Sequence, residues 1–131
     1  MKTVNHITNN NGLLKINLNN LSYNYNFLRK QVKPSRVASV LKSNCYGLGL
    51  DRVTKKLVNL GCKDFFLTSF EEASTLKKIT SEGNVILLNG IIGQTEKEIY
   101  NSFKSKIIPV INSLNELKKF YKYYLANTLY G

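Results

Sequence analysis

Three times between residues 64 and 125, a short apolar run is followed by a serine or threonine with a glutamate three positions later. The pairs are Ser69 with Glu72, Thr95 with Glu98, and Ser113 with Glu116. In this arrangement the hydroxyl and the carboxylate can each accept a hydrogen bond from a free backbone N–H at the start of a helix. A capped helix placed after an apolar strand predicts a βα unit, so this region should contain several such units in succession.

The spacing of apolar residues sets the bounds of these units. Strands are predicted at 37–41, 64–68, 85–88 and 106–111, and helices at 50–60, 69–79, 95–103 and 113–125. Right-handed crossovers make such strands parallel, and Pro109 favours an edge position for the last one. A complete (β/α)8 barrel requires roughly 250 residues. The 131 residues therefore predict an α/β fold that is about half of a TIM-type barrel, with four parallel βα units.

A short strand and a helix are predicted before the first unit. Over residues 13–18, apolar residues alternate with polar ones, as they do in a half-buried strand. The helix is predicted to open at Asn19 or Asn20 and to run to about Val32, because Pro34 follows. Residues 1–131 are thus predicted to form one domain.

The first predicted barrel strand ends in a lysine. Residues 37–41 form an apolar run that leads into Lys42, and Tyr46 follows between polar residues and glycines. A lysine in this place either extends its ammonium group to water or loses its proton in an apolar setting. A deprotonated lysine is a nucleophile that can condense with an aldehyde, the attachment that pyridoxal phosphate uses. The alternative is a lysine that only terminates a strand.

The segment around Lys42 resembles the cofactor lysine segment of alanine racemases. That pattern is an apolar strand, Lys, two or three small or polar residues, Tyr, Gly and a further Gly. The residues in register are Lys42, Asn44, Tyr46, Gly47 and Gly49. Leu48 stands where the family usually has a histidine, which is not one of its chemical groups. Basic amino-acid decarboxylases and pyridoxal phosphate homeostasis proteins also end their first barrel strand in a lysine, but they lack the Tyr-Gly-x-Gly.

The resemblance implies a cofactor, a site and an activity. Lys42 would carry pyridoxal 5'-phosphate and serve as the base on one face of the substrate, and Tyr46 would donate a hydrogen bond to the cofactor phosphate. Val40 and Leu88 would line the apolar side of the cofactor, although core packing also explains both. An enzyme of this family interconverts L-alanine and D-alanine, which supplies D-alanine for peptidoglycan. Its partner would be a small amino-acid substrate.

The resemblance covers roughly residues 13–125 and implies only the N-terminal portion of the family. In the family, the second base is a tyrosine of a C-terminal domain, contributed across the interface of a homodimer. The sequence reads from Ala126 to Gly131 where a fifth strand would start, so we expect the C-terminal domain to be absent and this chain to be inactive alone. The alternative is a pyridoxal-phosphate-binding half barrel of another fold type III enzyme, or a homeostasis protein.

The charge of the chain suggests a third hypothesis. Nineteen Lys and Arg against 8 Asp and Glu give a formal charge of +11, which is typical of proteins that bind nucleic acids. However, the lysines are scattered over every predicted helix, and no RRM, KH or helix-turn-helix signature occurs. A basic nucleic-acid-binding protein therefore stays an alternative, and no nucleic-acid partner is predicted.

Other classes of function lack a signal in the sequence. His6 is the only histidine, and Cys45 and Cys62 do not have the spacing of metal ligands, so no metal site is predicted. No apolar run approaches the ~20 residues of a membrane span. Residues 1–11 contain no apolar segment of a secretory signal. These observations predict a cytoplasmic protein with no membrane partner.

Overall fold

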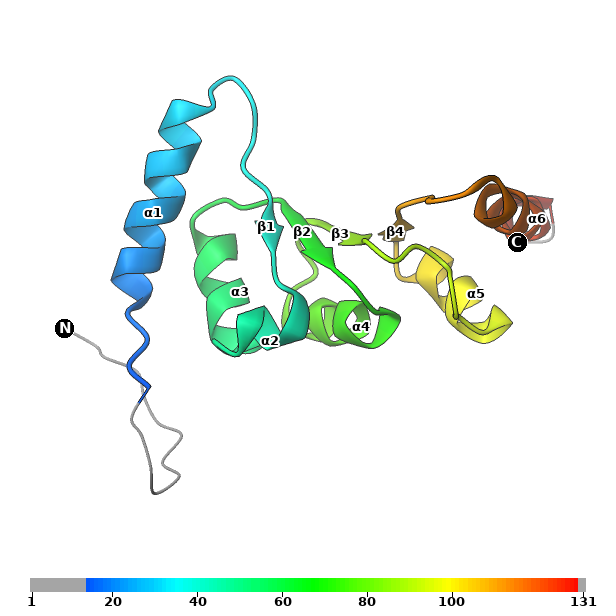
Figure 1. The fold of residues 1–131 in the computed structure, drawn as a ribbon, viewed down its shortest axis with the longest axis horizontal. Helices are drawn as coiled ribbons and strands as arrows, with labels where there is room; N and C mark the ends of the chain where they lie inside the picture. The colour runs from blue at the N-terminus through cyan, green and yellow to red at the C-terminus, as the bar shows by residue number, and fades with distance from the viewer. Residues whose placement is uncertain (1–13, 130–131) are drawn as a thin grey trace.

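The computed structural model describes residues 14–129 of the chain. Four parallel strands form one sheet in the order β1-β2-β3-β4, as Figure 1 shows. The strands are β1 (Ser39–Val40), β2 (Asp64–Leu67), β3 (Asn84–Leu87) and β4 (Ile107–Pro109). The helices are α1 (Leu18–Gln31), α2 (Lys42–Tyr46), α3 (Leu50–Asn59), α4 (Phe70–Ile79), α5 (Glu96–Lys104) and α6 (Leu114–Leu129). The four predicted parallel βα units are confirmed, and β4, which contains Pro109, is an edge strand.

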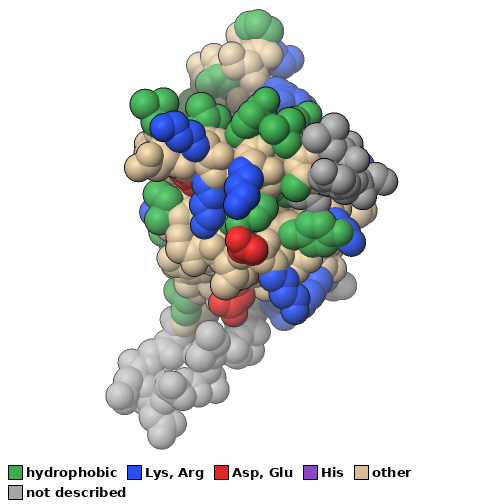
Figure 2. Space-filling model, turned by 90° about the vertical axis from the view of Figure 1, so that its right-hand side faces the viewer, with side chains coloured by type: hydrophobic (Ala, Val, Ile, Leu, Met, Phe, Trp, Pro, Cys, Tyr) green, Lys and Arg blue, Asp and Glu red, His purple; other side chains and the backbone are tan. Residues whose placement is uncertain are grey.

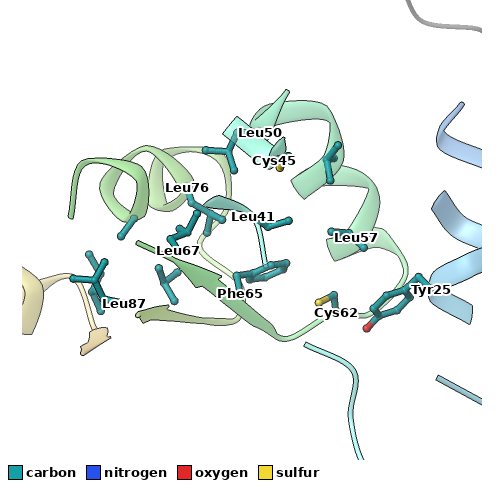
Figure 3. Packing of buried hydrophobic residues seen from close by; sticks show 14 residues of the cluster. Tyr25, Leu41, Cys45, Leu50, Leu57, Cys62, Phe65, Leu67, Leu76 and Leu87 are labelled. Carbon is teal, nitrogen blue, oxygen red and sulfur yellow. The ribbon is translucent and has the colours of Figure 1, made fainter. Parts of the chain in front are cut away.

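Helices lie on one face of the sheet. In Figure 1, α3 and α4 lie below the strands, and α1 lies beside α3 at the β1 edge. The strand residues that point toward the helices are buried: Phe65, Leu67, Val85, Leu87 and Ile107. Figure 3 shows Leu41 and Leu67 next to Leu76 of α4. Removal of these apolar side chains from water is the main force that holds the βα units together.

The opposite face of the sheet is also apolar but partly open. The strand pairing places Val40, Phe66, Ile86 and Ile108 in one row across the four strands. At the two ends of this row, Val40 and Ile108 are exposed. Parallel sheets in complete folds are covered on both faces. The row therefore forms an apolar surface that the described residues leave accessible at its edges.

The region before β1 differs from the prediction. Of the predicted strand at 13–18, position 13 lies outside the described residues, only Ile16 forms a single bridge, and α1 already begins at Leu18. The physical reason is Asn17, whose side chain accepts hydrogen bonds from the backbone N–H groups of positions 19 and 20. Asn17 is thus the N-cap, and the predicted opening of the helix at 19 or 20 lies too late.

The three predicted capping boxes are not alike. At α5, Thr95 and Glu98 exchange hydrogen bonds as predicted. At α4 and α6 the serine hydroxyl caps the helix, but the carboxylates of Glu72 and Glu116 bind backbone N–H groups that lie before the helix and in a neighbouring loop. The local pattern therefore predicts the start of each helix, while the partner of the glutamate depends on the tertiary structure.

Basic side chains are spread over the face of the molecule that carries α6 (Figure 2). Figure 2, viewed from the end that carries α6, shows Lys and Arg interspersed with hydrophobic side chains and few acidic ones. Within residues 14–129, no group of three or more His, Cys, Asp and Glu residues is arranged to hold a metal ion. In the same part of the chain, no helix has the length and apolar character needed to cross a bilayer.

Candidate functional site at the carboxyl end of the sheet

Lys42 lies where the edge strand β1 ends. The N–H of Leu41 still pairs with the carbonyl of Phe66 on β2, at 2.8 Å, and Lys42 follows directly as the first residue of α2. Its side chain is half-buried. In parallel α/β folds, ligands bind at the carboxyl ends of the strands. β1 therefore places Lys42 at the carboxyl end of the sheet, where a ligand-binding site is expected.

The turn after Lys42 has an unusual backbone. Ser43, Asn44, Cys45 and Tyr46 all have positive φ angles, between 53° and 57°. The segment α2 is thus a left-handed helical turn, a conformation that costs a non-glycine residue roughly 1–2 kcal/mol. Four such residues in succession persist only if their surroundings impose the conformation, and strain of this kind is concentrated at functional sites.

Three anchors impose this conformation. Cys45 is only 3% exposed and lies in the core near Leu50, as Figure 3 shows. The side-chain oxygen of Asn44 accepts a hydrogen bond from the N–H of Leu50 at 2.7 Å, which ties the turn to the start of α3. The N–H of Ser43 donates to Oε1 of Glu72 at 2.6 Å. The turn is therefore fixed to the core, to α3 and to α4.

Glu72 lies in the first turn of α4 and uses both carboxylate oxygens. Oε1 accepts the Ser43 N–H, and Oε2 accepts the N–H and the hydroxyl of Thr68 at 3.1 and 2.9 Å. Burial acts to raise the pKa of Glu72, but the hydrogen bonds from Thr68 and Ser43 outweigh it and hold the pKa below its usual range. Glu72 is therefore an ionised link between the end of β2 and the lysine turn.

Cys45 has a structural role in the turn. Burial, together with the negative charge of Glu72, raises the pKa of its thiol to about 11. The thiol is therefore protonated at neutral pH and is a weak nucleophile. Cys45 therefore acts as a small apolar residue of the core.

The anchors leave the side chains of Lys42 and Tyr46 outside the core. Tyr46 is 62% exposed. The Nζ atom of Lys42 lies 5.9 Å from the centroid of the Tyr46 ring, at the outer limit of a cation–π contact. The left-handed turn thus brings an amine and a phenol together at the carboxyl end of β1.

Val40 and Leu88 lie on the sheet face that the helices do not cover. Val40 belongs to β1 and is 44% exposed. Leu88 directly follows β3, is half-buried, and pairs through its N–H with the carbonyl of Leu67 at 2.8 Å. Neither residue belongs to the hydrophobic core cluster. Val40 is two residues from Lys42 in the chain, whereas Leu88 is two strands away.

One cavity adjoins this site and another lies away from it. One of about 410 Å³ adjoins the lysine turn and is lined by Asn44, Leu50, Ser69, Glu71, Glu72 and Thr75. Another, of about 270 Å³, lies beneath α1 near the amino ends of the strands, with Arg29, Lys33 and Arg36 in its wall. Neither cavity is lined by Lys42, Tyr46, Val40 or Leu88. Only the first touches the lysine turn, through Asn44, so the turn remains the candidate site.

The sequence did not reveal how Glu72 and Asn44 act. The capping pattern identified Glu72, but it assigned the carboxylate to the N-cap residue of the same helix rather than to Ser43. Asn44 matched the lysine motif without an assigned role. The capping pattern after β2 was the one available signal, because the contact with Ser43 joins residues 29 positions apart in the chain.

The fold and the site together define the amino-terminal part of a parallel barrel with a lysine at the end of its first strand. A family model described as "Alanine racemase, N-terminal domain" matches residues 16–128. The chain therefore belongs to the alanine racemase N-terminal domain family.

Curated relatives show the same likeness over most of the chain. The alanine racemase of Brucella ovis is 35% identical over 108 residues, which are 82% of this chain and 26% of the relative. The catabolic alanine racemase of Rhizobium johnstonii is 36% identical over 109 residues, or 82% of this chain and 28% of the relative. The chain thus spans little more than a quarter of the length of these relatives.

Solved structures confirm the half-barrel fold. The alanine racemase from Bartonella henselae, with covalently bound pyridoxal phosphate, matches with a TM-score of 0.78 and 30% identity over 86% of this chain and 31% of that one. The alanine racemase of Clostridium difficile 630 matches with a TM-score of 0.71 at 24% identity, covering 87% of this chain and 29% of that one. The four-stranded sheet corresponds to the N-terminal part of the barrel in the Bartonella enzyme.

Proposed function

We propose that this chain is the lysine-bearing part of a pyridoxal-phosphate-dependent alanine racemase, an isomerase that interconverts L-alanine and D-alanine. The observation that carries the proposal is the placement of Lys42 at the carboxyl end of β1, in a strained turn held by three anchors. Family membership supports the same reaction. Supply of D-alanine for peptidoglycan is the corresponding cellular role.

The residues at this edge suit the chemistry of pyridoxal phosphate. The aldehyde of the cofactor requires a primary amine, which Lys42 offers from a half-buried position. The phosphate requires hydrogen-bond donors, and the exposed hydroxyl of Tyr46 is one. The pyridine ring requires apolar surface, which Val40 and Leu88 provide on the sheet face away from the helices.

Each residue has a defined task in this proposal. When bound, pyridoxal phosphate supplies an electron sink that stabilises the negative charge left at the α-carbon. Nζ of Lys42 holds the cofactor and, in its free form, accepts or returns the α-proton on one face of the substrate. Tyr46 donates its O–H to a phosphate oxygen, and Val40 and Leu88 exclude water from the ring.

Racemisation also requires a proton-transfer group on the opposite face of the substrate. The family resemblance assigns this group to a tyrosine of another domain, supplied within a homodimer. We therefore expect the 131-residue chain by itself to bind the cofactor but not to interconvert the two alanines. A turnover near ~10 s⁻¹, which is typical of enzymes, would contradict this expectation.

The proposal is tested by borohydride reduction of the chain in the presence of pyridoxal phosphate, followed by peptide mass mapping. We expect the stable label on Lys42, together with a visible absorption band that Lys42→Ala never shows. Lys55→Ala is the matched control, because Lys55 is an exposed lysine paired with Asp51 on α3. A label distributed evenly over the surface lysines would contradict the assignment of Lys42.

A further inference from the structure

We propose that Glu72 is a positioning residue for Lys42, because its carboxylate holds the backbone of the lysine turn through the N–H of Ser43. This inference rests on the proposed function of Lys42 and adds the residue that sets the place of its amine. Glu72 forms neither an ion pair with the Lys42 amine nor a hydrogen bond with Tyr46; its carboxylate binds the N–H of Ser43, so it acts through the turn.

The hydrogen bond between Ser43 and Glu72 is formed by the peptide group directly after Lys42. The N–H of Ser43 belongs to the peptide group that joins Lys42 to Ser43, and it donates to Oε1 of Glu72 at 2.6 Å. A hydrogen bond to an ionised carboxylate is among the strong ones in proteins. Because this peptide group leaves Lys42 directly, fixing its plane restricts the backbone from which the lysine side chain extends.

The hydrogen bonds within the turn use other donors. The N–H of Gly47 donates to the carbonyl of Ser43, and the N–H of Gly49 donates to the carbonyl of Asn44, each at 3.0 Å. The N–H of Ser43 stands at the start of the left-handed turn and donates to Glu72 instead. Glu72 thus supplies the acceptor that a helical turn does not provide for its first N–H groups.

Glu72 is itself held in place by the neighbouring strand. Its other oxygen accepts two hydrogen bonds from Thr68, which directly follows β2. The carboxylate therefore connects two rigid points, the end of β2 and the turn after β1. Such a connection can hold a side chain with the precision that a catalytic amine requires.

A glutamate in a capping pattern does not need to bind a separate loop, as α5 shows. The sequence pattern is the same, but the carboxylate of Glu98 accepts the N–H and the hydroxyl of Thr95, at 2.8 and 2.9 Å, within its own capping box. The two oxygens of Glu72 instead accept hydrogen bonds from Ser43 and Thr68, which lie outside its capping pattern. This difference makes Glu98 a matched control: it is a capping glutamate that does not bind the lysine turn.

The test compares Glu72→Met, Glu72→Gln and Glu98→Met with the wild type. Methionine keeps the length of the side chain and removes both acceptors, whereas glutamine keeps one. The first measurement, without cofactor, is hydrogen–deuterium exchange of the Ser43 amide by NMR. We expect exchange roughly tenfold faster in Glu72→Met, an intermediate rate in Glu72→Gln, and the wild-type rate in Glu98→Met.

The second measurement is the selectivity of the borohydride label for Lys42 over Lys55 in the presence of pyridoxal phosphate. A residue that only stabilises the fold would not change this ratio in folded protein. We expect the ratio to fall several-fold in Glu72→Met, to recover in part in Glu72→Gln, and to stay at the wild-type value in Glu98→Met. Among the variants that fold, selectivity should follow the protection of the Ser43 amide.

The possible outcomes separate the inference from the function on which it rests. A folded Glu72 variant that loses protection of Ser43 but keeps full selectivity overturns the inference alone. An equal loss of selectivity in Glu98→Met also overturns it, because any lost helix cap would then have the same effect. If the wild type shows no selective label on Lys42, the proposed function fails first and the inference falls with it.

Discussion

At the carboxyl end of the sheet, two pairs of loops are each joined by the carboxylate of one glutamate. Glu72 joins the end of β2 to the turn after β1. Glu116 joins the loop after β4 to the loop after β3, since its two oxygens accept the N–H of Ile91 at 2.5 Å and the N–H of Asn112 at 2.7 Å. The two bridges differ in their surroundings, because Glu116 is 4% exposed whereas Glu72 is half-buried.

The loops that these glutamates hold differ more than the bridges do. After β3, Gly90 and Ile91 are buried against the Glu116 carboxylate. After β1, the left-handed turn leaves Lys42 half-buried and Tyr46 exposed. The same carboxylate bridge therefore accompanies one loop that is buried and one loop that leaves a lysine and a tyrosine side chain outside the core. The difference in exposure arises from the loops rather than from the bridge.

Gly90→Ala should have the largest effect on stability. A Cβ atom at this position would overlap the carboxylate of Glu116 and the carbonyl of Val110, and the backbone φ is +61°. We expect a loss of about 4 kcal/mol or more in the free energy of unfolding, measured in urea, from the combined overlap and strain. Gly47→Ala is the control, because its φ is +83° and its Cβ would meet no atom within 4 Å. Equal losses in the two variants would contradict the close packing at Gly90.

Glu116→Leu should have the next largest effect. The substitution leaves the N–H groups of Ile91 and Asn112 without the acceptor that they share. The N–H of Ile91 is buried and that of Asn112 is partly buried. A buried donor that loses its partner costs about 1–3 kcal/mol, so we expect a loss of about 3 kcal/mol in the same urea measurement. Glu98→Leu should lose only about 1 kcal/mol, as expected for a helix cap. If Glu116→Leu lost no more free energy of unfolding than Glu98→Leu, the Glu116 bridge would contribute nothing to stability beyond a helix cap.

Local patterns predicted the βα units because each unit depends on neighbours in the chain. An apolar run, a capping serine or threonine and a glutamate lie within a few residues, so the sequence shows them together. The prediction failed at 13–18, where the side chain of Asn17 starts α1. It also missed the bridges of Glu72 and Glu116, because each joins residues of separate loops.

The candidate site was predicted in part. The sequence identified Lys42 and Tyr46 through their motif, and their roles toward the cofactor stay predictions, as do those of Val40 and Leu88. The glycines after Tyr46 indicated a turn, but they did not reveal the left-handed conformation of the non-glycine residues before them. That conformation depends on anchors in α3 and α4, which no local preference encodes.

The pH dependence of stability should separate Glu72 from an uncharged residue at the same place. Although burial acts to raise the pKa of Glu72, its hydrogen bonds lower the pKa below the usual range. A carboxyl group of this kind stabilises the fold above its unfolded pKa, near ~4.3, and the stabilisation is lost as the pH falls through the folded pKa. We expect the free energy of unfolding to decrease more steeply in the wild type than in Glu72→Gln as the pH is lowered from about 5. Parallel curves would exclude a contribution from this carboxylate.

Tyr46→Phe should have the smallest effect on stability and a clear effect on the cofactor. The ring is 62% exposed and lies outside the buried core, so the free energy of unfolding should change by less than about 0.5 kcal/mol. Loss of a hydrogen bond to a charged phosphate corresponds to ~1.5–3 kcal/mol. We therefore expect the affinity for pyridoxal phosphate, titrated through the visible band, to fall at least several-fold.

Tyr121→Phe is the matched control for this prediction, because Tyr121 is 58% exposed and lies on α6. It should change neither stability nor affinity. Unchanged affinity in Tyr46→Phe would mean that the hydroxyl does not hold the phosphate, and the turn after β1 would then present Lys42 alone. A marked loss of stability would instead make Tyr46 a fourth anchor of the turn. If Tyr46→Phe lowers the affinity for pyridoxal phosphate and leaves the free energy of unfolding unchanged, the loop after β1 presents the tyrosine for binding. This would contrast with the buried loop after β3.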